Sequence, residues 1–145
     1  MRLKIEINTR EHFHILGLHN NQFAIDNPWF SKSVGINSFY LEELLATKLR
    51  ALYQRKKGRD LFDLSCALKL FPDIEVQNIM KCFKEYMLFD KNKVSRKEFE
   101  TCLNAKLQDP TFINDIKPLL AVHHLEEYDV VTEGEKINLM LISQI

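Results

Sequence analysis

Apolar and polar residues alternate without a break over residues 3–8, close to the start of the chain. The apolar set is Leu3, Ile5 and Ile7, and Glu6 stands in the middle of the polar set. Alternation with a period of two is typical of a strand that buries one face, so these residues predict a half-buried strand. On spacing alone, Glu6 is a solvated residue of that strand.

Further extended segments are expected before the first helix. The mixed apolar run 12–18 predicts either a strand or a short turn. The asparagine pair 20–21 indicates a turn before a strand at 22–26, and the Asn-Pro pair 27–28 ends that strand. Residues 34–40 predict a last strand, which leads into the first helix.

From Leu41 onward the apolar residues recur at intervals of three and four, which is the period of an amphipathic helix. Pro72 closes a second helix that opens at Asp60, and Asp73 is an N-cap candidate for the third. The apolar stripes of the first and third helices are Leu41, Leu44, Leu45, Leu49 and Leu52, then Val76, Ile79, Met80, Phe83 and Met87.

The later helices have clear start signals. Ser95 and Glu98 have the spacing of a capping box, and Asp109 precedes a proline at the first helical position. Pro118 interrupts the segment that follows. The expected core residues of the last helices are Phe99, Cys102, Leu103, Leu107, Val130, Ile137 and Leu141. The fold class is therefore α+β, with a small β-rich segment at residues 1–40 and a helical bundle at residues 41–145.

Lys48 falls inside the apolar stripe of the first helix, seven residues after Leu41 and four before Leu52. A lysine at such a position either extends its stem along the apolar surface to reach water, or meets an anion. The spacing leaves both interpretations open.

The densest group of charges surrounds the turn after this helix. Gly58 is placed to end the first helix, and Asp60 to open the second, where a carboxylate suits the helix N-terminus. Asp60 and Asp63 are three residues apart and share a helical face. The basic residues of the turn are Arg55, Lys56, Lys57 and Arg59. The pattern fits either a site for a phosphate and its metal or a solvated basic turn with an acidic cap.

The charge balance and the cysteine content of the chain limit its possible functions. The 145 residues carry 20 Lys and Arg against 20 Asp and Glu, so contact with nucleic acid depends on the local cluster at 55–59. Cys66, Cys82 and Cys102 stand apart among apolar residues, which indicates reduced core thiols. The sequence shows no signal peptide and no apolar run of membrane-spanning length. We therefore expect a cytoplasmic protein without a membrane partner.

Two apparent metal patterns do not hold. The histidines at 12, 14 and 19 lack the cysteine or acidic partners that a metal site needs. Residues 90–98 resemble a calcium loop, but Glu98 falls at its ninth position and the loop glycine is absent. The capping box explains the same residues.

Taken together, these segments resemble the AbiEii/AbiGii family of abortive-infection nucleotidyltransferase toxins. The resemblance is carried by residues 3–8 (Leu-Lys-Ile-Glu-Ile-Asn), 27–31 (Asn-Pro-Trp-Phe-Ser), 40–52 (Tyr-Leu-Glu-Glu-Leu-Leu-Ala-Thr-Lys-Leu-Arg-Ala-Leu) and 55–64 (Arg-Lys-Lys-Gly-Arg-Asp-Leu-Phe-Asp-Leu). Residues 94–96, Phe99, Leu103 and 109–120 fit its helical tail. It covers essentially the whole chain, and the C-terminal half of a typical family member.

The resemblance implies a metal-dependent transferase of the polymerase-β type, in which residues 1–40 are the remnant of the nucleotidyltransferase sheet. Such enzymes use Mg²⁺ and move a nucleotidyl group from an NTP to an acceptor such as tRNA, and an antitoxin accompanies them. By resemblance, Glu6 is a metal ligand, Lys48 contacts the NTP phosphates and Asp60 is the acid of an arginine–aspartate motif. In the same comparison, Asp63, Arg55 and Arg59 support these residues at the substrate.

The chain departs from the family pattern in one large respect. Members carry a Gly-Gly or Gly-Ser turn and an Asp-x-Asp pair, and this sequence has neither. We therefore expect the chain alone to be inactive and to bind no cofactor tightly. Three hypotheses follow: the C-terminal half of a toxin-type nucleotidyltransferase, a helical interaction module for an N-terminal half, an antitoxin or RNA, or a relic without a retained task. Self-association through the edge of the strand at 3–8 belongs to the second.

Overall fold

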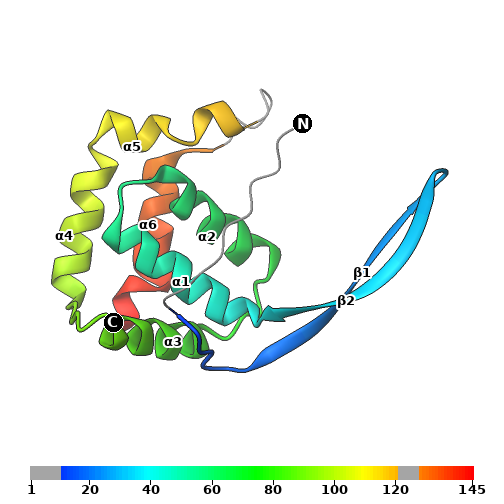
Figure 1. Cartoon of the computed structure of the whole chain (residues 1–145). Helices are drawn as coiled ribbons and strands as arrows, with labels where there is room; N and C mark the ends of the chain where they lie inside the picture. The colour runs from blue at the N-terminus through cyan, green and yellow to red at the C-terminus, as the bar shows by residue number, and fades with distance from the viewer. Residues whose placement is uncertain (1–10, 121–127) are drawn as a thin grey trace. The chain divides into compact units, whose positions relative to one another are not determined.

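The computed structural model describes residues 11–120 and 128–145 of the chain. The chain divides into two compact units, Met1–Tyr40 and Leu41–Ile145. The described part of the first unit is a β-hairpin, and that of the second is helical (Figure 1). The α+β prediction is therefore confirmed. The strand expected at residues 3–8, with Glu6, lies outside the described residues, and the origin of residues 1–40 as a nucleotidyltransferase remnant stays a prediction.

The hairpin consists of strand β1 (Leu18–Asn27) and strand β2 (Phe30–Phe39), paired antiparallel in a two-stranded sheet. The connection between the strands is tight because the Asn27 side-chain oxygen accepts the backbone N–H groups of Trp29 and Phe30, both at 3.0 Å. The predicted break at residues 27–28 is thus confirmed.

Two predictions for this segment are wrong. The asparagine pair 20–21 forms no turn: both residues belong to β1, and the Asn20 amide donates a hydrogen bond of 2.8 Å to the Asn37 side chain on β2. Strand β2 begins at Phe30, four residues before the predicted start. At these positions, cross-strand pairing outweighs the local preference of the residues for a turn.

The helical unit contains α1 (Leu41–Gln54), α2 (Gly58–Leu70), α3 (Val76–Phe89), α4 (Arg96–Leu107), α5 (Pro110–Asn114) and α6 (Val130–Met140), with short 3₁₀ turns η1 (Lys117–Leu119) and η3 (Ile142–Gln144). Helix α1 packs against α2 and α3, and α2 packs against α6 (Figure 1). The fully buried side chains of the helical unit include Leu49, Leu52, Leu61, Leu64, Ile79, Phe83, Phe99 and Ile137.

The predicted helix starts are confirmed where a side chain forms a capping hydrogen bond with a nearby backbone N–H. Ser95 and Glu98 form the capping box of α4, with the Ser95 N–H donating to Glu98 at 2.8 Å. Asp109 caps α5 by accepting from the Thr111 N–H at 2.7 Å. The prediction for Asp73 is wrong, because α3 begins one residue after Glu75 and Asp73 lies in the preceding turn.

The three cysteines are free thiols, as the sequence predicts. Cys82 is buried, and burial raises the pKa of its thiol to about 11, which keeps it protonated and unreactive. Burial also raises the pKa of Cys66. Over the described residues, none of the helices has the length and apolar character needed to span a bilayer.

Candidate functional site

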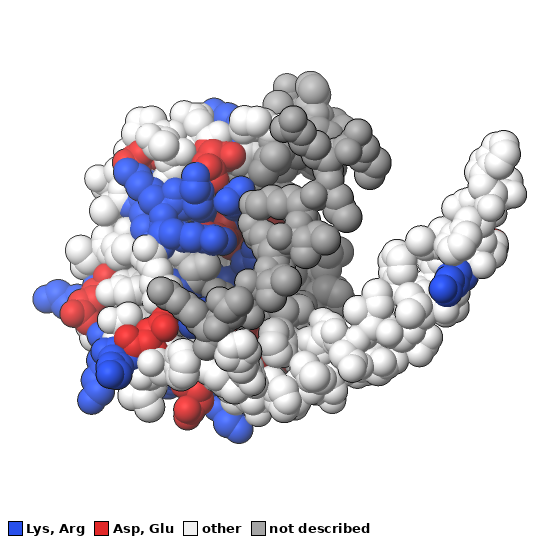
Figure 2. Space-filling model, in the orientation of Figure 1, with Lys and Arg blue, Asp and Glu red and all other residues white. Residues whose placement is uncertain are grey.

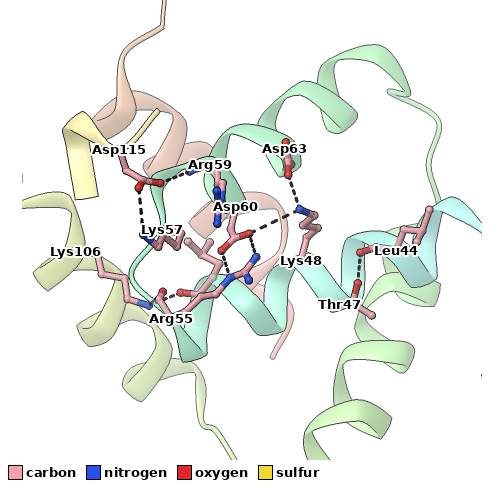
Figure 3. Close-up of polar contacts among 11 residues, drawn as sticks. Leu44, Thr47, Lys48, Arg55, Lys57, Arg59, Asp60, Asp63, Lys106 and Asp115 are labelled. Atoms are coloured by element: carbon pink, nitrogen blue, oxygen red, sulfur yellow. Dashed lines mark hydrogen bonds and ion pairs between the residues drawn. The ribbon is translucent and has the colours of Figure 1, made fainter. Parts of the chain in front are cut away.

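The basic turn between α1 and α2 brings together most of the predicted site residues. Helix α1 ends at Gln54 and α2 starts at Gly58, so residues 55–57 alone connect two helices that pack against each other. The short connection sets Lys48, on α1, beside Asp60 and Asp63, in the first two turns of α2. We call Lys48, Arg55, Asp60 and Asp63 the Asp60 cluster (Figure 3).

Asp60 is the buried centre of this cluster. Its side chain is 0% exposed, and both of its oxygens accept hydrogen bonds from Arg55: Nη2 donates to Oδ1 at 2.6 Å and Nε donates to Oδ2 at 2.7 Å. This fork geometry is the strongest form of a carboxylate–guanidinium pair. The hydrogen bond with Asp60 raises the pKa of Arg55 above its ordinary value, so the guanidinium stays charged. A buried carboxylate would otherwise be strongly unfavourable.

Lys48 forms ion pairs with two carboxylates. This decides between the two interpretations of its position in the apolar stripe, contact with water or contact with an anion. Its ammonium donates to Asp63 Oδ2 at 2.6 Å and lies 3.8 Å from Asp60 Oδ1. The lysine side chain is 37% exposed and that of Asp63 is 41% exposed, so solvent reaches both. The apolar stripe beside it is narrower than predicted, because Leu44 is exposed while Leu45, Leu49 and Leu52 are buried.

Gly58 begins α2 instead of ending α1, which corrects the prediction for this residue. The φ angle of Gly58 is not in the left-handed region. Glycine is needed at this position because of close packing: a Cβ added at Gly58 would lie 2.4 Å from the backbone oxygen of Phe112. The absence of a side chain lets α5 lie against the first turn of α2. Asp115, just after α5, then accepts from the Arg59 N–H at 3.5 Å and pairs with Lys57 at 3.5 Å.

Most cations of the turn are already paired with carboxylates. Lys56 pairs with Asp109 and Lys57 with Asp115 (Figure 3 shows the second pair). The Arg59 side chain is exposed and has no hydrogen bond or ion pair with any residue in 11–120 or 128–145. Figure 2 shows lysines and arginines mixed with carboxylates over the visible face of the helical unit. Within the described part of the chain, Arg59 is therefore the cation of the turn that has no carboxylate partner.

Lys106 is a supporting residue that the sequence reasoning missed. It is buried, and its ammonium donates to the carbonyl oxygens of Leu52, of Tyr53 at 2.8 Å and of Arg55 at 3.0 Å. These carbonyls belong to the end of α1, where they have no helical partner. Burial lowers the pKa of Lys106. The contact fixes the backbone from which Arg55 reaches Asp60.

A signal for Lys106 was present in the sequence. It lies seven residues after Phe99 and three after Leu103, inside the apolar stripe of α4, as Lys48 lies inside that of α1. A lysine in such a stripe needs polar partners, which predicts a contact but not the carbonyls that supply it.

The described residues do not form a magnesium site. Both Asp60 oxygens are used by Arg55, and the oxygen of Asp63 nearest the cluster is used by Lys48. Over residues 11–120 and 128–145, no group of three or more His, Cys, Asp or Glu side chains is arranged to hold a metal ion. Glu6, the predicted metal ligand, lies outside the described residues. Of the predicted site, the structure thus brings together four residues and leaves Arg59 beside them.

Comparison with known proteins matches the chain to a protein family. The family model described as the nucleotidyl transferase AbiEii toxin of type IV toxin–antitoxin systems matches residues 1–133. That range contains the Asp60 cluster, Arg59 and Lys106. No curated protein and no solved structure matches the chain.

Proposed function

The chain belongs to the AbiEii family of nucleotidyl transferase toxins of type IV toxin–antitoxin systems, and from that premise we propose that its Asp60 cluster binds the phosphates of a nucleoside triphosphate. Lys48 and Arg59 make the phosphate contacts. Asp60, which is fixed by Arg55, and Asp63 hold Lys48 in position. One observation carries the proposal: a half-exposed lysine is aimed by two carboxylates, one of which is fully buried and fixed by an arginine.

Asp60 serves in this scheme as an anchor and not as a metal ligand or base. Its two oxygens are satisfied by Arg55, and Lys48 lies 3.8 Å from one of them. A buried charge held by a bidentate pair has little freedom, so it orients the cations around it. Arg55 is 50% exposed, which leaves part of its guanidinium open to a ligand while the two donors remain on Asp60.

Asp63 acts as the partner that a phosphate replaces. The Lys48–Asp63 pair lies at the surface, and such pairs contribute only about 0–1 kcal/mol to stability. A phosphate oxygen therefore competes for the Lys48 ammonium at small cost. The two cations and two carboxylates of the cluster cancel in formal charge, so Arg59 supplies the excess positive charge that attracts the anion.

The activity of the family completes the scheme. Nucleotidyl transfer needs cations that neutralise the charge developing on the phosphates, and this is the task assigned to Lys48 and Arg59. The acceptor in this proposal is an RNA such as tRNA. The chain is inactive alone, because its sequence contains no Asp-x-Asp pair and no Gly-Gly or Gly-Ser turn. A cognate antitoxin accompanies it, as the family's toxin–antitoxin description implies.

The test is calorimetric titration of the whole chain with each of the four NTPs in Mg²⁺ buffer, with the wild type and Lys48→Ala. We expect one or more NTPs to bind the wild type. Loss of a charge-assisted hydrogen bond costs about 1.5–3 kcal/mol, so Lys48→Ala should weaken binding by about ten- to a hundredfold. The matching nucleoside, which lacks phosphates, should not bind measurably.

Lys136→Ala is the matched control. Lys136 is also a half-exposed lysine paired with a carboxylate, Glu133 at 2.8 Å, but it lies on α6 outside the cluster. It should leave NTP affinity unchanged. The proposal is wrong if no NTP binds the wild type, or if both lysine variants lose binding equally.

The second candidate function is a non-catalytic interaction module. The observation that favours it is the hairpin, whose strands are almost entirely exposed and carry large apolar residues. Absence of NTP binding together with specific association through the hairpin would select this function. Self-association through the edge of the strand at 3–8 stays a prediction, since that strand lies outside the described residues.

A further inference from the structure

The β-hairpin has one apolar face and one polar face. Residues directly opposite each other in an antiparallel pair point to the same side of the sheet. The register pairs Phe23 with Val34, Ile25 with Lys32, Asn21 with Ile36 and Asn27 with Phe30. One face therefore carries five large apolar side chains, which are between 41% and 54% exposed: Phe23, Ile25, Phe30, Val34 and Ile36.

The other face is polar apart from the Leu18–Phe39 pair at the base of the hairpin. It carries Asn20, Gln22, Asp26 and their partners on β2, in the register that pairs Asn20 with Asn37 and Asp26 with Ser31. Asn20 donates to Asn37 at 2.8 Å, Gln22 donates to Asn20 at 3.1 Å, and Ser31 donates to Asp26. These hydrogen bonds fix the register, so the apolar residues are held together on the opposite side.

A two-stranded hairpin is at best marginally stable in water and needs cover on its apolar face. Figure 2 shows the visible side of the hairpin as white apart from one basic residue, and Lys32 is the only lysine or arginine in residues 18–39. Trp29, in the connecting turn, is 93% exposed. Contiguous exposed apolar surface of this kind is typical of a binding face.

We propose that a second copy of this chain covers the apolar face, so that two hairpins pack face to face across a two-fold axis. The apolar face consists of five cross-strand pairs, from His19–Ser38 to Asn27–Phe30, and Phe23–Val34 is the central one. The two-fold axis lies between the two sheets, across the strands, at the level of this pair. It places Phe23 against Phe23 of the other copy and Val34 against Val34 of the other copy. An isologous contact of this kind is the commonest route to a dimer.

The charge on the face fits this arrangement. Lys32 and its partner Ile25 are one pair nearer to the turn than Phe23–Val34, and Asn21–Ile36 is one pair nearer to the base. When the two hairpins run in opposite directions, Lys32 of each copy lies opposite Asn21–Ile36 and not opposite the other Lys32. Like charges are thus kept apart.

The available area reaches the lower limit for a specific dimer. With about 150–250 Å² for a large side chain, the five half-exposed residues of the face offer about 350–600 Å² per copy, or about 700–1,200 Å² in total. Stable interfaces bury about 1,200–2,000 Å² in total. The dimer is therefore expected to be weak, with dissociation in the micromolar range.

Sedimentation velocity of the whole chain, from low to several hundred micromolar, tests the proposal with Val34→Lys and Ser33→Lys. Both variants add one positive charge to the same strand, Val34→Lys on the apolar face and Ser33→Lys on the polar face. We expect the wild type and Ser33→Lys to dimerise. Val34→Lys should weaken dimerisation by about tenfold or more, because it places a charge at the centre of the contact.

A second measurement guards against local unfolding of the hairpin in Val34→Lys. Val34→Cys should form an intermolecular disulfide on mild oxidation, since the two-fold axis brings both copies of residue 34 together, and Ser33→Cys should not exceed the wild-type background from its own three cysteines. A wild type that stays monomeric at all concentrations overturns the proposal. So does equal cross-linking of the two cysteine variants.

Discussion

Replacement of Arg55 by methionine would test whether Asp60 anchors the cluster. Arg55→Met removes the fork of two hydrogen bonds, of 2.6 and 2.7 Å, and leaves a fully buried carboxylate with Lys48 at 3.8 Å as its nearest cation. Breaking a buried pair from one side costs about 3–5 kcal/mol, because the remaining charge is uncompensated. Arg55 is half-exposed and Lys48 partly compensates, so we expect the free energy of unfolding to fall by about 2–4 kcal/mol.

The assay is urea unfolding followed by far-ultraviolet circular dichroism, with Arg55→Met, Asp60→Asn and the double variant. When Arg55 is absent, Asp60→Asn should be nearly neutral or stabilising, because no buried charge remains. The two single changes should therefore be non-additive, with a coupling energy of about 1.5–3 kcal/mol. Additive changes, or an Arg55→Met cost below about 0.5 kcal/mol, would show that the buried pair does not hold the turn.

The neighbouring pair Lys56–Asp109 provides the control for this experiment. It joins the same turn to the start of α5, but both of its side chains reach solvent. Lys56→Met should change the free energy of unfolding by less than about 1 kcal/mol, because exposed ion pairs contribute little. A similar cost for Lys56→Met and Arg55→Met would attribute the effect to loss of positive charge in the turn and not to the burial of Asp60.

Two further predictions concern packing and pH. Gly58→Ala should destabilise the helical unit by about 1–3 kcal/mol, because the added Cβ meets a backbone oxygen. In Gly134→Ala the added Cβ meets only the movable end of the Leu107 side chain, so this change should cost less. Chemical unfolding of both variants measures the difference. The Ser95 backbone and hydroxyl lower the pKa of Glu98 from its ordinary value of 4.5, so its contribution is complete above that value and is lost as the pH falls through the lowered pKa. The stability difference between wild type and Glu98→Gln should therefore be constant near neutral pH and disappear in acid, and a difference that grows in acid would contradict this sign.

The parts of the fold that could be predicted from sequence are those settled by nearby residues. The capping box of Ser95 and Glu98 and the N-cap of Asp109 each close within three residues, so spacing alone identifies them. The apolar spacing of α3 predicted Ile79, Met80, Phe83 and Met87, which are buried, but it included Val76, which is only partly buried, and missed Cys82 and Tyr86. The prediction for Asp73 was wrong although Asp73 is the only preferred N-cap type between Pro72 and Val76. The N-cap of α3 is Glu75, which forms no side-chain capping hydrogen bond, so local capping preference did not set this helix start.

Partners that are distant in sequence explain the remaining errors. The spacing of Gly58 suits a helix end, but the glycine is needed because Phe112 approaches from another helix. The asparagines at 20 and 21 suit a turn, but Asn37 lies opposite the first of them and holds it in a strand. In both cases the deciding contact belongs to tertiary structure, which overrides the local preference.

Lys48 and Lys106 show how far the sequence signal for a site extends. Each lysine stands in the apolar stripe of its helix, and each finds the polar partners that such a position demands. Lys106 is buried against backbone carbonyls, which no ligand displaces without opening the end of α1. Lys48 is held by carboxylates at a surface that solvent reaches, so an anion can take the place of Asp63. The same pattern thus occurs for a structural lysine and for a candidate binding lysine, and the exposure of the residue distinguishes the two.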